Sequence, residues 1–288
     1  MANDMTPPAP RDLTAEAYSR RDLWLCLARA FAPPGGDDYL AAFRDDLPAD
    51  LDAIGEEIGL HFGPETAALR TAAAAIPDAL ELQKLYAALF LTPPTPVQPN
   101  TGVYIDGGLM GETPRGLDAA YARHGFERHT HFRDLSDTPG VQADFLALLY
   151  EKAGREAANR EGIAARAFMT EAEEIIARFP ARWATPFLRD LERVCDAHGL
   201  NPAYVHLARI LWLAVEGAMQ APEVQVIRDG AAQLPAGSSR GIGALKAVDL
   251  AEIAYRLERD GLAWDHVAKN DGWDDAVFAA RRARGEDG

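Results

Sequence analysis

Two histidines, His129 and His131, have the spacing in this sequence that best suits metal binding. Imidazole is a common ligand of zinc and other transition metals, but a structural zinc site takes four ligands. No cysteine and no carboxylate stands at a recognisable ligand offset from the pair. We therefore expect two solvated loop residues. An all-α metal-dependent hydrolase that uses these histidines remains an alternative.

Glycine-rich stretches and a serine pair are the other places where chemistry could occur. Residues 107–111 (Gly-Gly-Leu-Met-Gly) lack the Lys-Ser/Thr of a P-loop, and residues 241–243 (Gly-Ile-Gly) lack the preceding strand of a dinucleotide site. The serine pair at 238–239 has no histidine in a recognisable motif. We therefore predict no active site, no enzymatic activity and no cofactor.

Aromatic and acidic residues between positions 82 and 151 point to peptide binding instead. Tyrosine combines apolar area with a hydroxyl group, which suits a partly hydrated binding surface. An acidic side chain at the edge of such a surface would attract a cationic peptide. The predicted groove residues are Tyr86, Leu89, Phe90, Pro93, Tyr104, Tyr121, Asp137, Thr138, Gln142, Asp144 and Phe145.

Six of these residues also have a structural interpretation, and the sequence leaves both open. The five aromatic residues fit core positions as well as a groove; the sequence favours the core for Phe90 and Phe145 and the groove for the three tyrosines. Asp137 fits the N-cap or first turn of the helix that follows it. A carboxylate at a helix start can still attract a cation, so the two roles of Asp137 do not exclude each other.

Two helices on either side of a long loop must position these residues. An apolar face at residues 82–90 predicts a helix that ends before the proline pair at 93–94, and the corner at 137–140 opens the second helix. The loop between them is rich in Pro and Gly and contains a short helix that carries Tyr121 and ends at Gly125. Loops of this length in a compact domain are usually functional.

Helical signals continue along the rest of the chain, and strand signals are sparse. Pro48 is expected to end a short helix. Pro186 and Pro202 each follow a capping residue and are expected at the first position of a helix, and Gly199 is expected as a C-cap. The sequence therefore predicts an all-α fold of about ten helices with a long Pro/Gly loop in the middle.

The predicted domain covers residues 13–221, with a mobile tail at 1–12. Residues 222–288 are expected to form a flexible loop and a helical extension that packs on the same domain. An amphipathic pattern in this extension places Leu250, Ile253, Ala254 and Leu257 on one face.

Composition narrows the class of partner. With 29 Lys and Arg against 44 Asp and Glu, the net charge of −15 argues against nucleic-acid binding and favours cationic partners. Cys26 and Cys195 lie in apolar helical patterns and are expected as buried reduced thiols. No secretory signal and no apolar run of roughly 20 residues is present, so we expect a cytoplasmic protein without a membrane span.

The central stretch resembles the TorD/DmsD/NarJ family of redox-enzyme maturation chaperones. It has a Tyr-x-x-Leu-Phe helix end at 86–90, a small-x-Tyr segment at 102–104 and a tyrosine in the next helix. Residues 135–145 read Leu-Ser-Asp-Thr-Pro-Gly-Val-Gln-Ala-Asp-Phe, where the family motif is Glu-Pro-Asp-His-Leu-Gly-Val-Glu-x-Glu-Phe. Thr138 therefore replaces the motif His, and Gln142 replaces its second Glu. The overall resemblance extends from about residue 18 to 213.

The resemblance implies a chaperone for the apo catalytic subunit of a molybdenum-cofactor oxidoreductase. Such a chaperone binds the twin-arginine signal peptide or N-terminus of that subunit and holds it for cofactor insertion before export. Asp137, with Thr138 and Gln142, would meet the arginine pair or the backbone of the client, and the aromatic residues would line the groove. A structural subunit of the mature oxidoreductase is the second alternative, and both a monomer and a homodimer remain open.

Overall fold

The structure, a computed structural model, describes residues 12–126 and 135–220. Within these ranges every regular element is a helix, which confirms the predicted all-α fold. The elements are α1 (Leu13–Ala30), α2 (Asp37–Ala41), the π-helical turn η1 (Ala42–Asp46), α3 (Leu47–Ile58), α4 (Gly63–Ala74), α5 (Ala79–Phe90), α6 (Gly102–Asp106), α7 (Glu112–His124), α8 (Pro139–Ala158), α9 (Gly162–Arg178), α10 (Pro180–His198) and α11 (Ala203–Met219).

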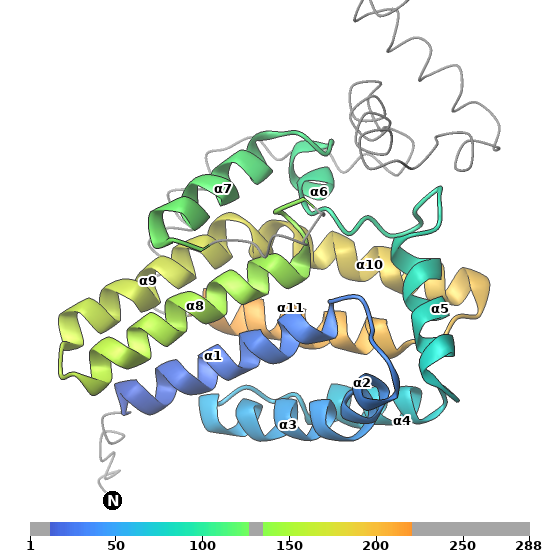
Figure 1. The fold of residues 1–288 in the computed structure, drawn as a ribbon, viewed down its shortest axis with the longest axis horizontal. Helices are drawn as coiled ribbons and strands as arrows, with labels where there is room; N and C mark the ends of the chain where they lie inside the picture. Colours follow the sequence, from blue (N-terminus) through green and yellow to red (C-terminus); the bar gives the residue numbers. More distant parts are fainter. Residues whose placement is uncertain (1–11, 127–134, 221–288) are drawn as a thin grey trace, which may run out of the picture.

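Helices α1 and α8 pack side by side through the middle of the molecule, as Figure 1 shows. Arg21, in the middle of α1, forms an ion pair of 2.8 Å with Glu151 in the second half of α8. At the start of α8, a Cβ atom on Gly140 would lie only 3.3 Å from the carbonyl oxygen of Ala28. The two helices therefore run antiparallel, and the end of α1 lies against the beginning of α8.

A buried aromatic cluster joins α1, η1, α5 and α11. Tyr204 of α11 is fully buried, and its ring centroid lies 5.4 Å from that of Phe90 and 5.9 Å from that of Tyr86. Phe31, directly after α1, and Phe43 in η1 lie 6.4 Å and 5.9 Å from the same ring. Edge-to-face and tilted ring contacts stabilise a fold beyond the contribution of the buried apolar area. The cluster therefore fixes the end of α1 relative to α5.

The prediction that a helix begins at Pro186 was wrong. Helix α10 begins at Pro180 and continues through Pro186, which lies inside it. Trp183, Phe187 and Leu191 are all buried along one face of α10. Burial of this continuous face outweighs the single backbone hydrogen bond that an internal proline removes.

Pro48 was also placed wrongly, because it does not end a helix. It lies in the first turn of α3, which follows η1 without a break, so the helical run continues through it. The predicted C-caps at Gly125 and Gly199 are confirmed, since both residues adopt the left-handed conformation at the ends of α7 and α10. The predicted tail at 1–12, apart from Asp12, and the extension at 222–288 lie outside the described residues.

Candidate functional site

A small cleft opens where the end of α1, the end of α5, the loop before α6 and the start of α8 meet. Its volume is about 120 Å³. The lining is mainly apolar and consists of Ala28, Phe31, Ala32, Pro33, Tyr86, Phe90, Leu91, Pro99, Asn100, Thr138, Pro139, Gly140, Val141, Asp144 and Phe187. Among the predicted site residues, the structure brings Tyr86, Phe90, Thr138 and Asp144 together here.

Aromatic rings form much of the cleft wall. Phe187 of α10 makes an edge contact of 5.8 Å with Phe31 and stacks at 6.2 Å on Phe90. Tyr86 packs at 5.0 Å on Phe90 and donates a hydrogen bond of 3.4 Å from its hydroxyl to the carbonyl oxygen of Phe31. Because these rings also contact the buried cluster around Tyr204, the wall is held in place by the core of the domain.

Behind the cleft, Asp137 is fully buried and binds the loop that precedes α6. Its Oδ2 accepts a 2.7 Å hydrogen bond from the backbone N–H of Gly102, and its Oδ1 accepts one of 3.1 Å from the Asn100 amide. Its carbonyl oxygen accepts from both the N–H (3.0 Å) and the hydroxyl (2.8 Å) of Thr101. Asp137 thereby fixes residues 100–102 against the start of α8.

Gln142 and Trp183 extend these hydrogen bonds to α10. The Gln142 side chain donates to the Thr101 hydroxyl at 2.7 Å and to the Asp137 carbonyl oxygen at 3.0 Å. In turn, Trp183 Nε1–H donates to Gln142 Oε1 at 3.0 Å. Gln142 and Trp183 are each only 1% exposed, so these contacts are shielded from water. We call the set Asn100, Thr101, Gly102, Asp137, Gln142 and Trp183 the Asp137 network.

The sequence predicts that Asp137 faces the client, whereas the structure places its side chain inside the domain. Both of its carboxylate oxygens are occupied inside the domain, and burial raises its pKa although Gly102 and Asn100 oppose the shift. Gly102 permits the close approach, since a Cβ atom there would lie 2.9 Å from Oδ2 of Asp137. Nor is Asp137 the N-cap of α8. That position belongs to Thr138, whose hydroxyl accepts from the Val141 N–H at 3.5 Å.

Three further predicted groove residues, Leu89, Tyr121 and Phe145, lie in the core, with exposed fractions of 0%, 3% and 0%. The ring centroid of Tyr121 is 4.7 Å from that of Phe145. The Tyr121 hydroxyl donates to the carbonyl oxygen of Ser136 at 2.9 Å, so the polar end of this side chain is satisfied without solvent. Gln142 is likewise buried, and its side-chain amide forms hydrogen bonds within the Asp137 network.

Tyr104 and Pro93 are accessible but do not line the cleft. Tyr104 is half-buried, packs at 6.1 Å on Phe187 and donates to Asp190 Oδ2 at 3.2 Å. Burial, and then the adjacent Asp190 carboxylate, raise the pKa of Tyr104 well above its ordinary value, so its hydroxyl stays protonated and remains a donor. Pro93 is exposed in the loop after α5.

Asp144 is the only charged side chain among the residues that line the cleft. It is exposed at the edge, one turn after the start of α8. Partial burial raises the pKa of Asp144, and the positive charge of Arg29 opposes this shift. The edge of the cleft therefore presents one carboxylate that still reaches solvent.

Sequence reasoning missed the contributions of α1 and α10 to this cleft. Phe31 and Phe90 share a local signal, because each is a helix-terminal aromatic residue followed within a few positions by a proline pair. This repeated pattern could have identified the end of α1 as a second wall. No local signal distinguishes Phe187 from the other apolar residues of α10.

No cluster of three or more potential metal ligands is present in residues 12–126 and 135–220. His129 and His131, the predicted metal-like pair, lie outside the described residues. Within the same described ranges, no helix combines the length and apolar character that crossing a bilayer requires.

The described part of the chain is thus an all-helical domain with a small, mainly apolar cleft and one carboxylate at its edge. A family model described as nitrate reductase delta subunit matches residues 45–189, about half of the chain. The chain therefore belongs to this family of molybdoenzyme maturation chaperones, and the family resemblance found in the sequence is confirmed. Comparison with curated proteins and with solved structures gave no match.

The Asp137 network predicts a distinctive double-mutant cycle. Gln142→Leu should lower the free energy of unfolding by about 1–3 kcal/mol, because Trp183 Nε1–H loses its acceptor while buried. In the Gln142→Leu background, Trp183→Phe should lower the free energy of unfolding by less than it does in the wild type. The reason is that no buried donor or acceptor of this pair is then left unpaired. Urea unfolding of the four proteins measures the coupling. Strict additivity would show that the contact does not bear on stability.

Proposed function

We propose that this chain binds the twin-arginine leader or N-terminus of the apo catalytic subunit of a molybdenum-cofactor oxidoreductase, in the cytoplasm and before export. The proposal is carried by one observation: the family match at 45–189 covers the segments that build most of the cleft, namely the end of α5, the loop before α6, the start of α8 and Phe187.

The size of the cleft limits what it can hold. An apolar cavity of about 150 Å³ in another protein accommodates a benzene molecule. The cleft here, at about 120 Å³, is therefore suited to one bulky apolar side chain and is too small for a whole helix. Burying one such side chain contributes about 1.5–3 kcal/mol, so further affinity must come from the surface around the opening.

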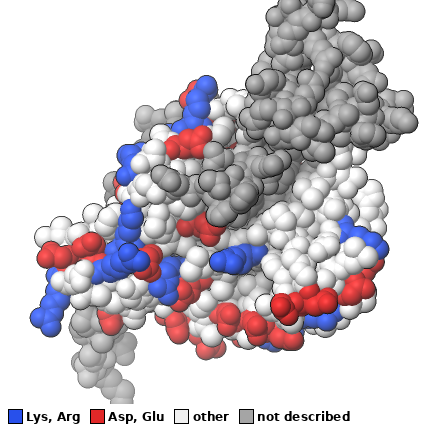
Figure 2. Space-filling model, viewed as in Figure 1, with Lys and Arg blue, Asp and Glu red and all other residues white. Residues whose placement is uncertain are grey.

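The surface near the cleft is suitable for the apolar part of a leader. Leu91 lines the cleft and is 56% exposed, and Pro93 is exposed two residues later. Figure 2 shows an uncharged area toward the end of α5 and acidic side chains along the lower edge of the same face. The exposed pair Glu81 and Lys84 lies nearer the start of α5. An apolar client segment would contact the uncharged area, and nearby acids would orient its cationic end.

The predicted residues then divide into three groups by role. Tyr86, Phe90, Thr138 and Asp144 would contact the client, with Asp144 taking the electrostatic role first assigned to Asp137. The buried residues Leu89, Tyr121, Asp137, Gln142 and Phe145 would act indirectly by holding the walls of the cleft. Pro93 and Tyr104 would belong to the surrounding surface.

The cleft assignment predicts a difference between two leucines of equal exposure. Leu91→Ser should weaken binding of a synthetic twin-arginine leader peptide about tenfold, because part of a leucine's burial is lost. Leu80, at the other end of α5, is also 56% exposed but does not line the cleft, so Leu80→Ser is the matched control. Isothermal titration measures both affinities. If the two variants bound the peptide with equal affinity, the peptide would not bind at the cleft beside Leu91.

The role of Asp144 predicts a pH dependence. Its carboxylate attracts a cationic peptide above its pKa and loses this attraction below it. Because that pKa is raised, affinity should fall at a higher pH than an ordinary aspartate would give. Asp144→Asn should weaken binding about twofold to fivefold at neutral pH and flatten the profile. Asp118→Asn, which removes an exposed acid of α7, should do neither. If the pH dependence of peptide affinity were the same in Asp144→Asn as in the wild type, Asp144 would not be the group that attracts the peptide.

The family description favours a second candidate, a subunit that stays in the mature oxidoreductase. The two functions differ in what the chain binds at the end of maturation. A chaperone should be recovered with the cofactor-free catalytic subunit and be absent from the cofactor-loaded enzyme. Affinity capture of the tagged chain from cells with and without molybdenum-cofactor synthesis measures this. Recovery of the chain in equal ratio with the loaded enzyme would support the subunit instead.

A further inference from the structure

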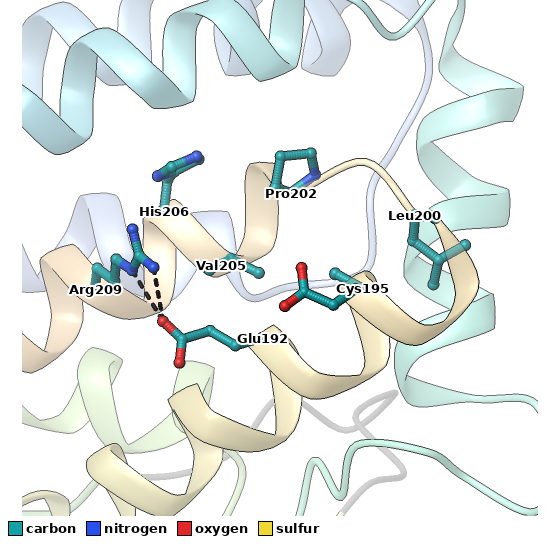
Figure 3. Close-up of a pocket in the computed structure, with 9 residues that line it drawn as sticks. Glu192, Cys195, Leu200, Pro202, Val205, His206 and Arg209 are labelled. Carbon is teal, nitrogen blue, oxygen red and sulfur yellow. Dashed lines mark hydrogen bonds and ion pairs between the residues drawn. The ribbon is translucent and has the colours of Figure 1, made fainter.

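A second hollow lies between α10 and α11, on elements that contribute little to the cleft. Its volume is about 650 Å³. Figure 3 shows Glu192 of α10 pointing toward Arg209 of α11, while His206 of α11 points away from Glu192. Cys195 and Val205 also line the hollow, and Pro202 lies near the turn that joins the two helices.

A third hollow, of about 450 Å³, continues the second one toward the end of α11. The two share Glu192 and Arg209, and the continuation is lined by Leu188 of α10 and by Trp212, Leu213 and Glu216 of α11, among others. We call the two together the α10–α11 groove. From Pro202 to Glu216 along α11 its length is about 21 Å, given the rise of an α-helix.

Arg209 and His206, in the middle of the groove, already have acidic partners. Arg209 contacts Glu192 at 2.7 Å and Glu65 of α4 at 3.6 Å, and His206 contacts the same Glu65 at 2.8 Å. An anionic ligand would have to displace these carboxylates from Arg209. The apolar side chains nearer the end of α11 are better suited to a contact with a partner.

Apolar side chains near the end of α11 remain incompletely covered. Leu188, Trp212 and Leu213 are each only partly buried, although they line one groove. A tryptophan in such a position offers a large area for a contact. An apolar strip of this kind between charged edges is typical of a surface that receives an amphipathic helix.

The chain itself supplies a segment of matching pattern and length. Helix α11 ends at Met219, one turn beyond Glu216, so residue 220, the last described residue before the extension, lies near the end of the groove. Residues 245–260 carry the apolar face of Leu250, Ile253, Ala254 and Leu257, and as a helix they would span about 24 Å. The intervening residues 221–244 can reach up to about 80 Å, which is ample for the chain to return.

We propose that residues 245–260 dock as a helix in the α10–α11 groove, with Leu250, Ile253 and Leu257 against Leu188, Trp212 and Leu213. The occupant is thus this chain's own extension, not a client peptide and not a second copy. Docking there would cover the apolar strip and leave the cleft between α1, α5 and α8 free.

A photo-cross-linking experiment on the full chain tests this proposal. The photoreactive residue p-benzoylphenylalanine replaces Leu213 in the groove or, as a control, Ile163, which is 90% exposed at the start of α9. Irradiation of the Leu213 variant should cross-link position 213 to a residue within 245–260 of the same molecule. Mass spectrometry identifies the linked peptide, and an unchanged mass on a denaturing gel shows that the cross-link is intramolecular. The Ile163 variant should not give this product.

Matched substitutions in the extension make the test specific. Ile253→Asp with Leu257→Asp should lower the yield of this cross-link about tenfold or more, since two buried apolar side chains are lost. Glu252→Ala with Arg259→Ala, on the opposite face, should leave it unchanged. No cross-link above the Ile163 control, a product of doubled mass, or equal yields from the two double variants would each overturn the proposal.

Discussion

Burial of the Asp137 carboxylate is the constraint on which the arrangement around the cleft depends. An ionised group in the interior is costly unless its hydrogen bonds are satisfied. Here Gly102, Asn100, Thr101 and Gln142 satisfy the side chain and the carbonyl oxygen of Asp137, and Trp183 completes the set. The loop before α6, the start of α8 and the beginning of α10 must therefore meet at one place.

The same constraint shapes the cleft, although Asp137 does not enter it. Two residues that line the cleft are held by Asp137. Asn100 donates a hydrogen bond to its carboxylate, and Thr138 is the next residue in the chain. The opposite wall rests on the aromatic cluster around Tyr204, which holds the ends of α1 and α5. A polar network on one side and packed rings on the other produce a small opening with fixed walls, which suits selection of one bulky side chain.

Much of the helical framework could be predicted because its signals are local. The apolar spacing in α5 and α8 and the glycines that end α7 and α10 each act within a few residues. Pro186 was misleading for the opposite reason. Its local signal favours a helix start, but burial of Trp183 and Phe187 on one face keeps α10 continuous.

The amino-acid order was enough to predict the all-α class, the family and part of the chain that lines the cleft, but not the contributions of α1 and α10. It could not decide which carboxylate is buried and which reaches solvent. Asp137 and Asp144 are seven residues apart in the sequence, on either side of the start of α8. Asp137 is buried because Gly102, 35 residues away, supplies its hydrogen bond, and Trp183 completes the network from 41 residues beyond Gln142. Such partners come together only when the helices pack. Only the tertiary structure therefore decides that Asp137 is buried and that Asp144 reaches solvent.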